Sequence, residues 1–507
     1  MNLTNLPLIS IVTFLPLVGA LILAFQNRED SNGLKQTALV VSILTFIVSL
    51  GFVVGGFRFD QAGFQFKETY QWIEAFKINY EVGIDGISLL LVLLTTFLMP
   101  LAILSSWNSI KDRLKEYMVF MLILETGMLG VFVSLDLFLF YVFWEVVLIP
   151  MYFLIGIWGG PRRVYAAVKF FLYTMAGSLL MLLAILWLGI NGGTFSLPAL
   201  MQNNSWLAGA PEMALFIAFA AAFAIKVPLW PFHSWLPDAH VEAPTAGSVI
   251  LAGVLLKMGT HGFLRFNLGL FPNASKEAAP VIAILAIIGI IYGAIVSFAQ
   301  TDVKKLVAYS SVSHLGFVML GIFSFTPQGI QGAVLQMINH GLSTGALFLM
   351  IGFIYERRHT REMDQFGGLW KILPVYGTLM LIVSLSSMGL PGLNGFVGEF
   401  TILLGTWQSG DGGVLGSYWY AALAAIGVIL AAIYILTMFQ RMFMGETRNE
   451  ENKHLLDLSE RELWVIVPLI IFIFVIGLYP NPFFEAMRSS VDGVLQHVGA
   501  AVAAVVH

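Results

Sequence analysis

The chain has 507 residues, of which 58% are hydrophobic and only 11% are charged, and its formal net charge is −4. Soluble domains carry roughly 25% charged residues, so the composition excludes a water-soluble globular protein. The absence of cysteine excludes thiolate catalysis and cysteine-ligated zinc or iron–sulfur sites in this chain. No basic arm is present, and nothing in the sequence indicates nucleic-acid binding.

Apolar runs of about 20 residues, the length of a transmembrane helix, follow one another along the chain. The first has no positive residue before Arg28, so it is interpreted as a membrane span rather than a signal peptide. Strands of a membrane barrel would be about 10 residues long and alternating, so an all-α polytopic membrane protein is predicted. Fourteen spans are predicted, near 3–25, 36–56, 84–106, 117–134, 136–158, 166–190, 212–235, 245–267, 279–300, 305–324, 329–355, 373–408, 416–442 and 462–480.

Three of these spans contain helix-breaking residues. Span seven contains Lys226-Val-Pro228-Leu-Trp-Pro231, span twelve contains Gly389-Leu-Pro391-Gly-Leu-Asn394-Gly395, and span five contains Pro150 as a softer break. A broken helix is tolerated at membrane depth only where protein or a watery cavity satisfies the freed backbone groups. A plain proline kink is the alternative for each single break.

The loops predict an orientation. Most of the 26 Lys and Arg residues lie in loops that follow odd-numbered spans, such as 107–116 and 357–371. The positive-inside rule places these loops in the cytoplasm or its equivalent. Both termini are therefore expected on the outer side, which for a bacterial plasma membrane is the periplasm.

Two segments outside the spans have patterns of their own. Residues 57–73 alternate apolar and polar side chains in places, which predicts a short hairpin on the outer face. After Pro482, apolar residues recur at helical spacing and predict an amphipathic helix on the outer surface or against a neighbouring chain. These residues are Phe484, Met487, Val491, Val494, Leu495 and Val498.

Ionisable side chains inside the spans point to function, because a lone charge at mid-membrane costs ~2.5–3.5 kcal/mol on insertion scales. A static ion pair between Glu145 and Lys226 is one interpretation, but it leaves Lys257 and Glu399 without a partner. For His314 and His340, the alternative is a buried structural histidine whose hydrogen bonds are satisfied. The set is interpreted as a proton relay of Glu145, Lys226, Lys257, His314, His340 and Glu399.

Lysine suits such a relay, because burial lowers the pKa of a lysine in general and a nearby carboxylate raises it again. Two other buried groups, Glu125 and His261, are assigned no role. His233 and His240 are seven residues apart and have no third ligand in a fitting frame, so no metal site is predicted. No redox cofactor is expected in this chain.

Several motifs together resemble one family over nearly the whole chain. They are Trp144-Glu145, Lys226-Val-Pro, Trp235-Leu-Pro-Asp-Ala-His240, Ala243-Pro-Thr-Ala-Gly247-Ser, Leu256-Lys257-Met-Gly, Ala308-Tyr-Ser-Ser-Val-Ser-His314-Leu-Gly-Phe and His340-Gly-Leu. The chain thus resembles the antiporter-like membrane subunits of proton-pumping NADH:quinone oxidoreductase, respiratory complex I. This resemblance implies a fourteen-helix fold with two inverted five-helix repeats, in which spans seven and twelve are broken.

The resemblance also implies a division of the chain into four parts. Residues 1–116 hold three spans and the hairpin, and 443–507 hold the last span and the amphipathic helix. Residues 117–267 and 279–442 are the two repeats, each a proton half-channel. Within the family the chain resembles the branch called subunit M or chain 4, because Glu399 stands where the L and N branches resemble one another in having lysine.

Residue roles follow from the same resemblance. Glu145 is expected to be the switch partner of Lys226, and Lys257 the central proton carrier. His314 and His340 continue the relay. Glu399 is the carrier on the exit side.

The expected function is proton translocation driven by quinone reduction in other subunits of an energy-coupling membrane, with the bacterial inner membrane as the expected location. NADH, FMN, iron–sulfur clusters and quinone are expected in partner subunits, and L-like and N-like subunits are expected on either side of this chain. Three alternatives remain open. They are a subunit of a multisubunit Na⁺/H⁺ antiporter, the equivalent subunit of a photosynthetic ferredoxin or NAD(P)H:plastoquinone oxidoreductase, and a purely structural scaffold.

Overall fold

A computed structural model describes residues 6–207, 210–447 and 449–506 of the chain, so positions 3–5 of the first predicted span lie outside it. Twelve helices in the described part are long and apolar enough to cross a membrane. They are α1 (Leu8–Phe25), α2 (Ser31–Val54), α3 (Gly86–Ser105), α4 (Leu114–Val133), α5 (Leu137–Trp158), α6 (Arg163–Gly192), a composite helix α10–α12 (Thr245–Leu270), α13 (Pro272–Phe298), α14 (Val303–Ile322), α15 (Pro327–Arg358), α19 (Trp419–Phe443) and α20 (Glu460–Leu478).

Two further spans are interrupted. One consists of α8 (Glu212–Lys226) and α9 (Trp235–Glu242), and the other of α17 (Pro374–Ser387) and α18 (Asn394–Ser409). Together with the twelve continuous helices, they match the fourteen predicted spans and confirm the breaks in spans seven and twelve. The predicted end of span seven at 235 is wrong, because α9 continues to Glu242. Asp238 and His240 lower the hydropathy of this half-helix, so an apolar window ends too early.

The predicted interruption at Pro150 is also wrong. Helix α5 runs without a break from Leu137 to Trp158 and contains Pro150. A single proline removes one backbone hydrogen bond, which a helix packed among others tolerates. The true break in span twelve also has Gly389 at φ +81° and Gly392 at φ +92°, a conformation that side-chain-bearing residues rarely adopt.

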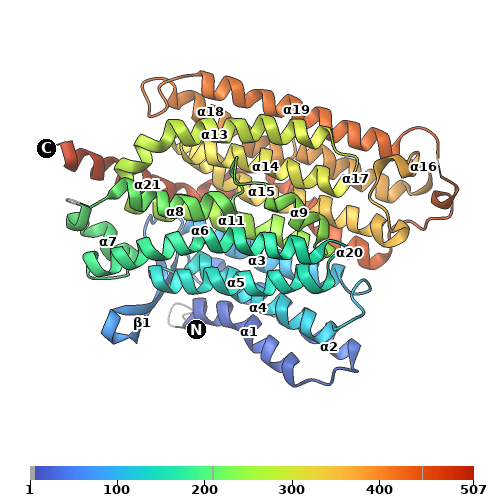
Figure 1. Cartoon of the computed structure of the whole chain (residues 1–507), viewed down its shortest axis with the longest axis horizontal. Coiled ribbons are helices and arrows are strands. Elements are labelled where there is room, and N and C mark those ends of the chain that lie inside the picture. The colour runs from blue at the N-terminus through green and yellow to red at the C-terminus, as the bar shows by residue number, and fades with distance from the viewer. Residues whose placement is uncertain (1–5, 208–209, 448, 507) are drawn as a thin grey trace.

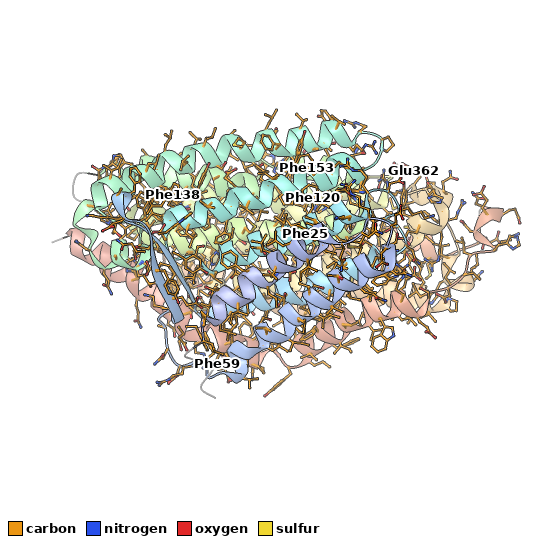
Figure 2. The ribbon with its side chains drawn as sticks, turned by 90° about the horizontal axis from the view of Figure 1, so that it is seen from below. Phe25, Phe59, Phe120, Phe138, Phe153 and Glu362 are labelled. Atoms are coloured by element: carbon orange, nitrogen blue, oxygen red, sulfur yellow. The ribbon has the colours of Figure 1, made fainter. Side chains whose placement is uncertain are left out.

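The helices run side by side along the long axis of the molecule, and both termini lie at the same end (Figure 1). This end, called the termini end below, also holds α7 (Leu197–Gln202) and the hairpin of β1 (Gln65–Ile73) and β2 (Ile78–Ile84). The opposite end holds α16 (Leu369–Ile372) and the loops with most of the Lys and Arg residues. It is called the basic end. Figure 2 labels Phe138 near the former and Glu362 near the latter.

The predicted hairpin exists, but it lies later in the chain than 57–73. Its antiparallel strands pair Tyr70 with Tyr80, and bulges interrupt the register on both sides. Glu68 points from β1 to the start of α1, where its Oε1 accepts hydrogen bonds from the Ile9 and Ser10 amides at 2.8 and 3.2 Å. A carboxylate at a helix N-terminus satisfies free amides and complements the helix dipole, so the hairpin holds the first span in place.

The C-terminal helix α21 (Asn481–Val506) is amphipathic as predicted, and it packs against this chain's own bundle. Met487 and Val491 are fully buried. The Ser490 hydroxyl accepts a hydrogen bond of 2.9 Å from the Gly86 amide at the start of α3, and His497 Nε2 contacts the Gly269 carbonyl at 2.8 Å. Helix α21 therefore links α3 to the composite helix α10–α12 at the termini end.

The surface of the molecule is apolar as well as its core, unlike the surface of a soluble protein. Large hydrophobic residues are exposed on the peripheral helices, and in Figure 2 Phe120 and Phe153 lie on neighbouring helices of one such face, with stacked rings 5.2 Å apart. The hydrophobic windows of the composite helix α10–α12 and of α15 are completely buried. These two central helices also carry Lys257 and His340. The periphery therefore suits lipid, and the ionisable groups lie in the protein interior.

Candidate functional site

Lys257 lies at the centre of the bundle between two π-helical turns. These turns, Leu251–Leu255 and Phe263–Asn267, interrupt the composite helix on either side of it. The Lys257 side chain is fully buried, and its Nζ donates hydrogen bonds to the Ala252 carbonyl and, at 2.7 Å, to His340 Nδ1 on α15. Wide turns of this kind leave carbonyls available and occur often at functional sites. The sequence carries no pattern that predicts them.

His314 and Glu399 form a second buried pair on the next two helices. His314 Nδ1 on α14 lies 2.6 Å from Glu399 Oε1 on α18, and both side chains are almost fully buried. Gln336 donates to the same oxygen at 3.0 Å. The Tyr434 hydroxyl lies 3.1 Å from His314 Nε2. The carboxylate is thus held in one position by two neighbours.

A short gap separates the two pairs. The rings of His314 and His340 have centroids 6.0 Å apart. A small cavity lined by both histidines, Asn339 and Ser343 lies between α14, α15 and the break in span twelve. His340 Nε2 and Glu399 Oε2 have no hydrogen-bond partner among the described residues. The structure therefore brings Lys257, His340, His314 and Glu399 into one buried row, with a polar cavity in the middle.

Amide and hydroxyl side chains support this row and satisfy the broken helix. Asn339 Nδ2 donates to the Asn394 carbonyl at 2.7 Å, and the Ser386 hydroxyl donates to Asn394 Oδ1 at 2.5 Å. The Ser343 and Ser386 hydroxyls lie 2.6 Å apart. Sequence reasoning missed these residues and Gln336. The signal that could have found them is the occurrence of amides within apolar spans, where an unpaired amide is costly.

Lys226 and Glu145 are near each other but form no direct ion pair. Lys226 is the last residue of α8, where the negative end of the helix dipole favours a cation. Its Nζ lies over the rings of Trp144 and Phe170, at 5.4 and 5.5 Å. Glu145 is half-buried on α5, and its Oε1 has no partner. Within the described residues, no carboxylate lies within 4.0 Å of the Lys226 ammonium.

The break that follows Lys226 is satisfied by its own surroundings. The Leu229 amide bonds to the Ala224 carbonyl at 2.8 Å, and the Trp235 indole donates to the Ile225 carbonyl at 2.8 Å. Helix α8 and α11 (Leu256–Gly262), the middle part of the composite helix, approach closely at Gly259, where an added Cβ would lie 2.9 Å from the Phe223 carbonyl oxygen. The helix ending in Lys226 therefore packs directly against the helix that carries Lys257.

Three other ionisable groups are buried without a role in the row. Both Glu125 oxygens and both nitrogens of His261 and of His240 have no hydrogen-bond partner within the described ranges. His240 stacks on Phe348 with ring centroids 4.6 Å apart. No group of three or more His, Cys, Asp or Glu side chains in the described part of the chain is placed to hold a metal.

These features define a class: a polytopic helical membrane protein with two oppositely directed broken spans and a row of buried ionisable residues at mid-membrane. Comparison with known proteins places it more closely. The family described as NADH:quinone oxidoreductase/Mrp antiporter, TM, matches residues 134–423, and the one described as NADH-ubiquinone oxidoreductase chain 4, amino terminus, matches residues 11–140. The chain belongs to the NADH-quinone oxidoreductase subunit M (chain 4) family.

Individual relatives align with nearly the whole of this chain. NADH-quinone oxidoreductase subunit M of Rhodobacter capsulatus is 46% identical over 97% of both chains. A chain in respiratory complex I from Thermus thermophilus with bound NADH has a TM-score of 0.86 at 31% identity, covering 97% of this chain and 99% of that one. A chain of the Mrp complex from Dietzia sp. has a TM-score of 0.80 at 21% identity, covering 99% and 56%, and shares the fold.

Proposed function

We propose that this chain translocates protons as a membrane subunit of NADH:quinone oxidoreductase, through Glu145, Lys226, Lys257, His340, His314 and Glu399. One observation carries the proposal: Lys257, His340, His314 and Glu399 form a single buried row of proton donors and acceptors across four helices. A structural role for any one of them would not require the others to be aligned. Placing four ionisable groups at mid-membrane costs free energy, and such groups are retained where they share a function.

Each transfer along the row moves one proton. Lys257 Nζ gives a proton to His340 Nδ1, and His340 releases the proton on its Nε2 toward the cavity that it shares with His314. A water molecule there can bridge the two rings. His314 then passes its Nδ1 proton to Glu399 Oε1. The free Glu399 Oε2 faces the break in span twelve, since an added Cβ at Gly389 would lie 3.5 Å from it.

The first half of the relay is a switch. Lys226 has aromatic rings around its ammonium and no ion pair with a carboxylate of the described residues, so the proton it holds is not tied to Glu145 in this state. Formation of the pair would stabilise the charged lysine, and its separation would release the proton toward Lys257. In this proposal Glu145 and Lys226 alternate between the separated arrangement of this structure and a direct ion pair.

Glu145→Gln is expected to lower NADH-driven proton pumping by about tenfold or more, in line with the usual contribution of a positioned acid or base. The amide keeps the shape of the side chain but cannot pair with Lys226 as an anion. Pumping by inverted membrane vesicles, normalised to assembled complex, measures the effect. Glu485→Gln, on an exposed position of α21, is the matched control, and equal pumping by both variants would refute the switch.

We also propose that the termini end faces the outer side of an energy-coupling membrane, here the bacterial inner membrane. The loops at the basic end hold most Lys and Arg residues, which retains them in the cytoplasm. A reporter enzyme fused after residue 507 is expected to be active only outside, and reporters in loops 107–116 and 357–371 only inside. A C-terminus accessible from the cytoplasm would contradict this orientation.

L-like and N-like subunits are proposed as the neighbours of this chain, and NADH, FMN, iron–sulfur clusters and quinone as cofactors of its partners. Support comes from the likeness of this chain to a chain in respiratory complex I from Thermus thermophilus with bound NADH. Electron transfer in the partner subunits would drive the proton steps. Copurification of the assembled complex, with identification of its chains, tests this assignment.

A further inference from the structure

The composite helix α10–α12 carries a further series of ionisable side chains, which runs from Lys257 away from the proposed relay. This series is called the ladder below. Lys257, His261 and Arg265 follow one another at intervals of four residues toward the termini end, and all three are buried. Side chains four residues apart lie on one face of a helix, about one turn apart. The π-helical turn Phe263–Asn267 lies at the outer part of this ladder. The ladder connects the central lysine with the termini end inside a single span.

His261 is the middle member of this ladder, between Lys257 and Arg265. Its side chain is 2% exposed, and neither ring nitrogen has a hydrogen-bond partner within the described residues. Its ring lies against Phe132 of α4, with ring centroids 5.4 Å apart and the planes nearly perpendicular. An imidazole one turn from a proton carrier can accept and return protons. Without a barrier to protons, His261 would connect Lys257 with the termini end, and protons would return to Lys257 from that side of the membrane.

Arg265 stands between His261 and the surface of the termini end. Its guanidinium donates a 2.6 Å hydrogen bond to Asp85 Oδ2, and it lies 4.8 Å from the centre of the Phe64 ring. The Arg265 side chain is 9% exposed. The other Asp85 oxygen caps α3 by accepting from the Ile87 and Ser88 amides. The cation is therefore fixed from two sides, at the point where the ladder meets solvent.

We propose that Arg265, held by Asp85, is a charge barrier that prevents protons at the termini end from reaching Lys257 through His261. Asp85 offsets part of this charge, but Arg265 acts on His261 more strongly than Asp85 does, so the positive charge one helical turn away opposes the arrival of a second positive charge at His261. Arginine suits the task because it stays protonated at all physiological pH values and does not itself relay protons. Positive charges close channels and pores to protons in the same way. The first repeat is thereby closed toward the termini end, and protons leave through Glu399.

The inference rests on Lys257 being a proton carrier, and its test is passive leak rather than pumping. The assembled complex is reconstituted in vesicles, a pH gradient is imposed without NADH, and its decay is followed with a pH-sensitive dye. Arg265→Gln is expected to speed the decay by about tenfold, as expected from loss of a charge at one-turn distance. Arg488→Gln, which removes an exposed arginine on α21, is the control and should leak no faster than the wild type.

The double variant Arg265→Gln/His261→Phe separates the charge barrier from a structural clamp. Phenylalanine keeps a ring against Phe132 but cannot carry a proton, so the barrier predicts that the leak falls back to the wild-type rate. A leak that persists in the double variant, or an Arg265→Gln complex as tight as the wild type, would overturn the inference. Normal pumping by Lys257→Met would instead reject the relay on which the inference rests.

Discussion

Lys257→Met is expected to lower NADH-driven proton pumping by at least tenfold, and quinone-linked electron transfer should fall with it because the two are coupled. Proton transfer by a positioned acid or base contributes about 10²–10⁴-fold to a rate. Methionine is unbranched like lysine and only one atom shorter, so it fills most of the same site and packing is largely kept. The His340 Nδ1 atom, which lies 2.7 Å from Lys257 Nζ, loses its proton source.

Proton uptake by inverted vesicles, normalised to assembled complex, measures this loss. Lys453→Met is the control, because this lysine lies exposed in the loop before α20 and pairs only with Glu450 at the surface. The control variant should pump at the wild-type rate. If Lys257→Met pumped equally well while fully assembled, the central position of Lys257 would be structural, and the scaffold interpretation would replace the relay.

Glu399→Gln is expected to block the exit of protons with a loss of similar size, also at least about tenfold. The glutamine side chain has the same shape and can still contact His314 and Gln336, which lie 2.6 and 3.0 Å from Glu399 Oε1. It cannot take up and release a proton at this position. Glu399→Lys is expected to keep partial pumping, because lysine can also carry a proton there.

Glu277→Gln is the matched control, since Glu277 is exposed on α13. The measurement is again pumping per assembled complex, with electron transfer recorded in parallel. Wild-type pumping by Glu399→Gln would place the exit elsewhere, with the Nε2 of His340 as the next candidate. Loss of pumping in both Gln and Lys variants would show that position 399 requires a carboxylate.

The span boundaries could be predicted from sequence because hydropathy over about 20 residues is a strong and local signal. Predicted and observed ends of most spans differ by only a few residues, as at 136–158 and Leu137–Trp158. The prediction failed where local composition and tertiary packing disagree. Helix α9 is half-polar in sequence, but it is stabilised by packing, since Asp238 pairs with Lys169 at 2.7 Å. Pro150 leaves α5 intact because the surrounding helices support it.

The residues of the proposed relay could be named from sequence, but their contacts could not. A buried charge is visible in a hydropathy profile, whereas the pairing of Lys257 with His340 joins residues 83 positions apart. The same limit applies to Glu145 and Lys226, which were predicted as switch partners and have no direct contact in this state. The π-helical turns beside Lys257 depend on how the whole span packs, so no sequence motif predicts them.

Infrared difference spectroscopy of the reconstituted complex during NADH turnover tests the central claim most directly, namely that Lys257 delivers protons to Glu399. The account predicts a carboxylic acid band that appears on turnover, that is absent in Glu399→Gln and is therefore assigned to Glu399, and that is also absent in Lys257→Met. A Glu399 band that persists unchanged in Lys257→Met would contradict the account, because Glu399 would then receive its protons by a route that does not pass through Lys257.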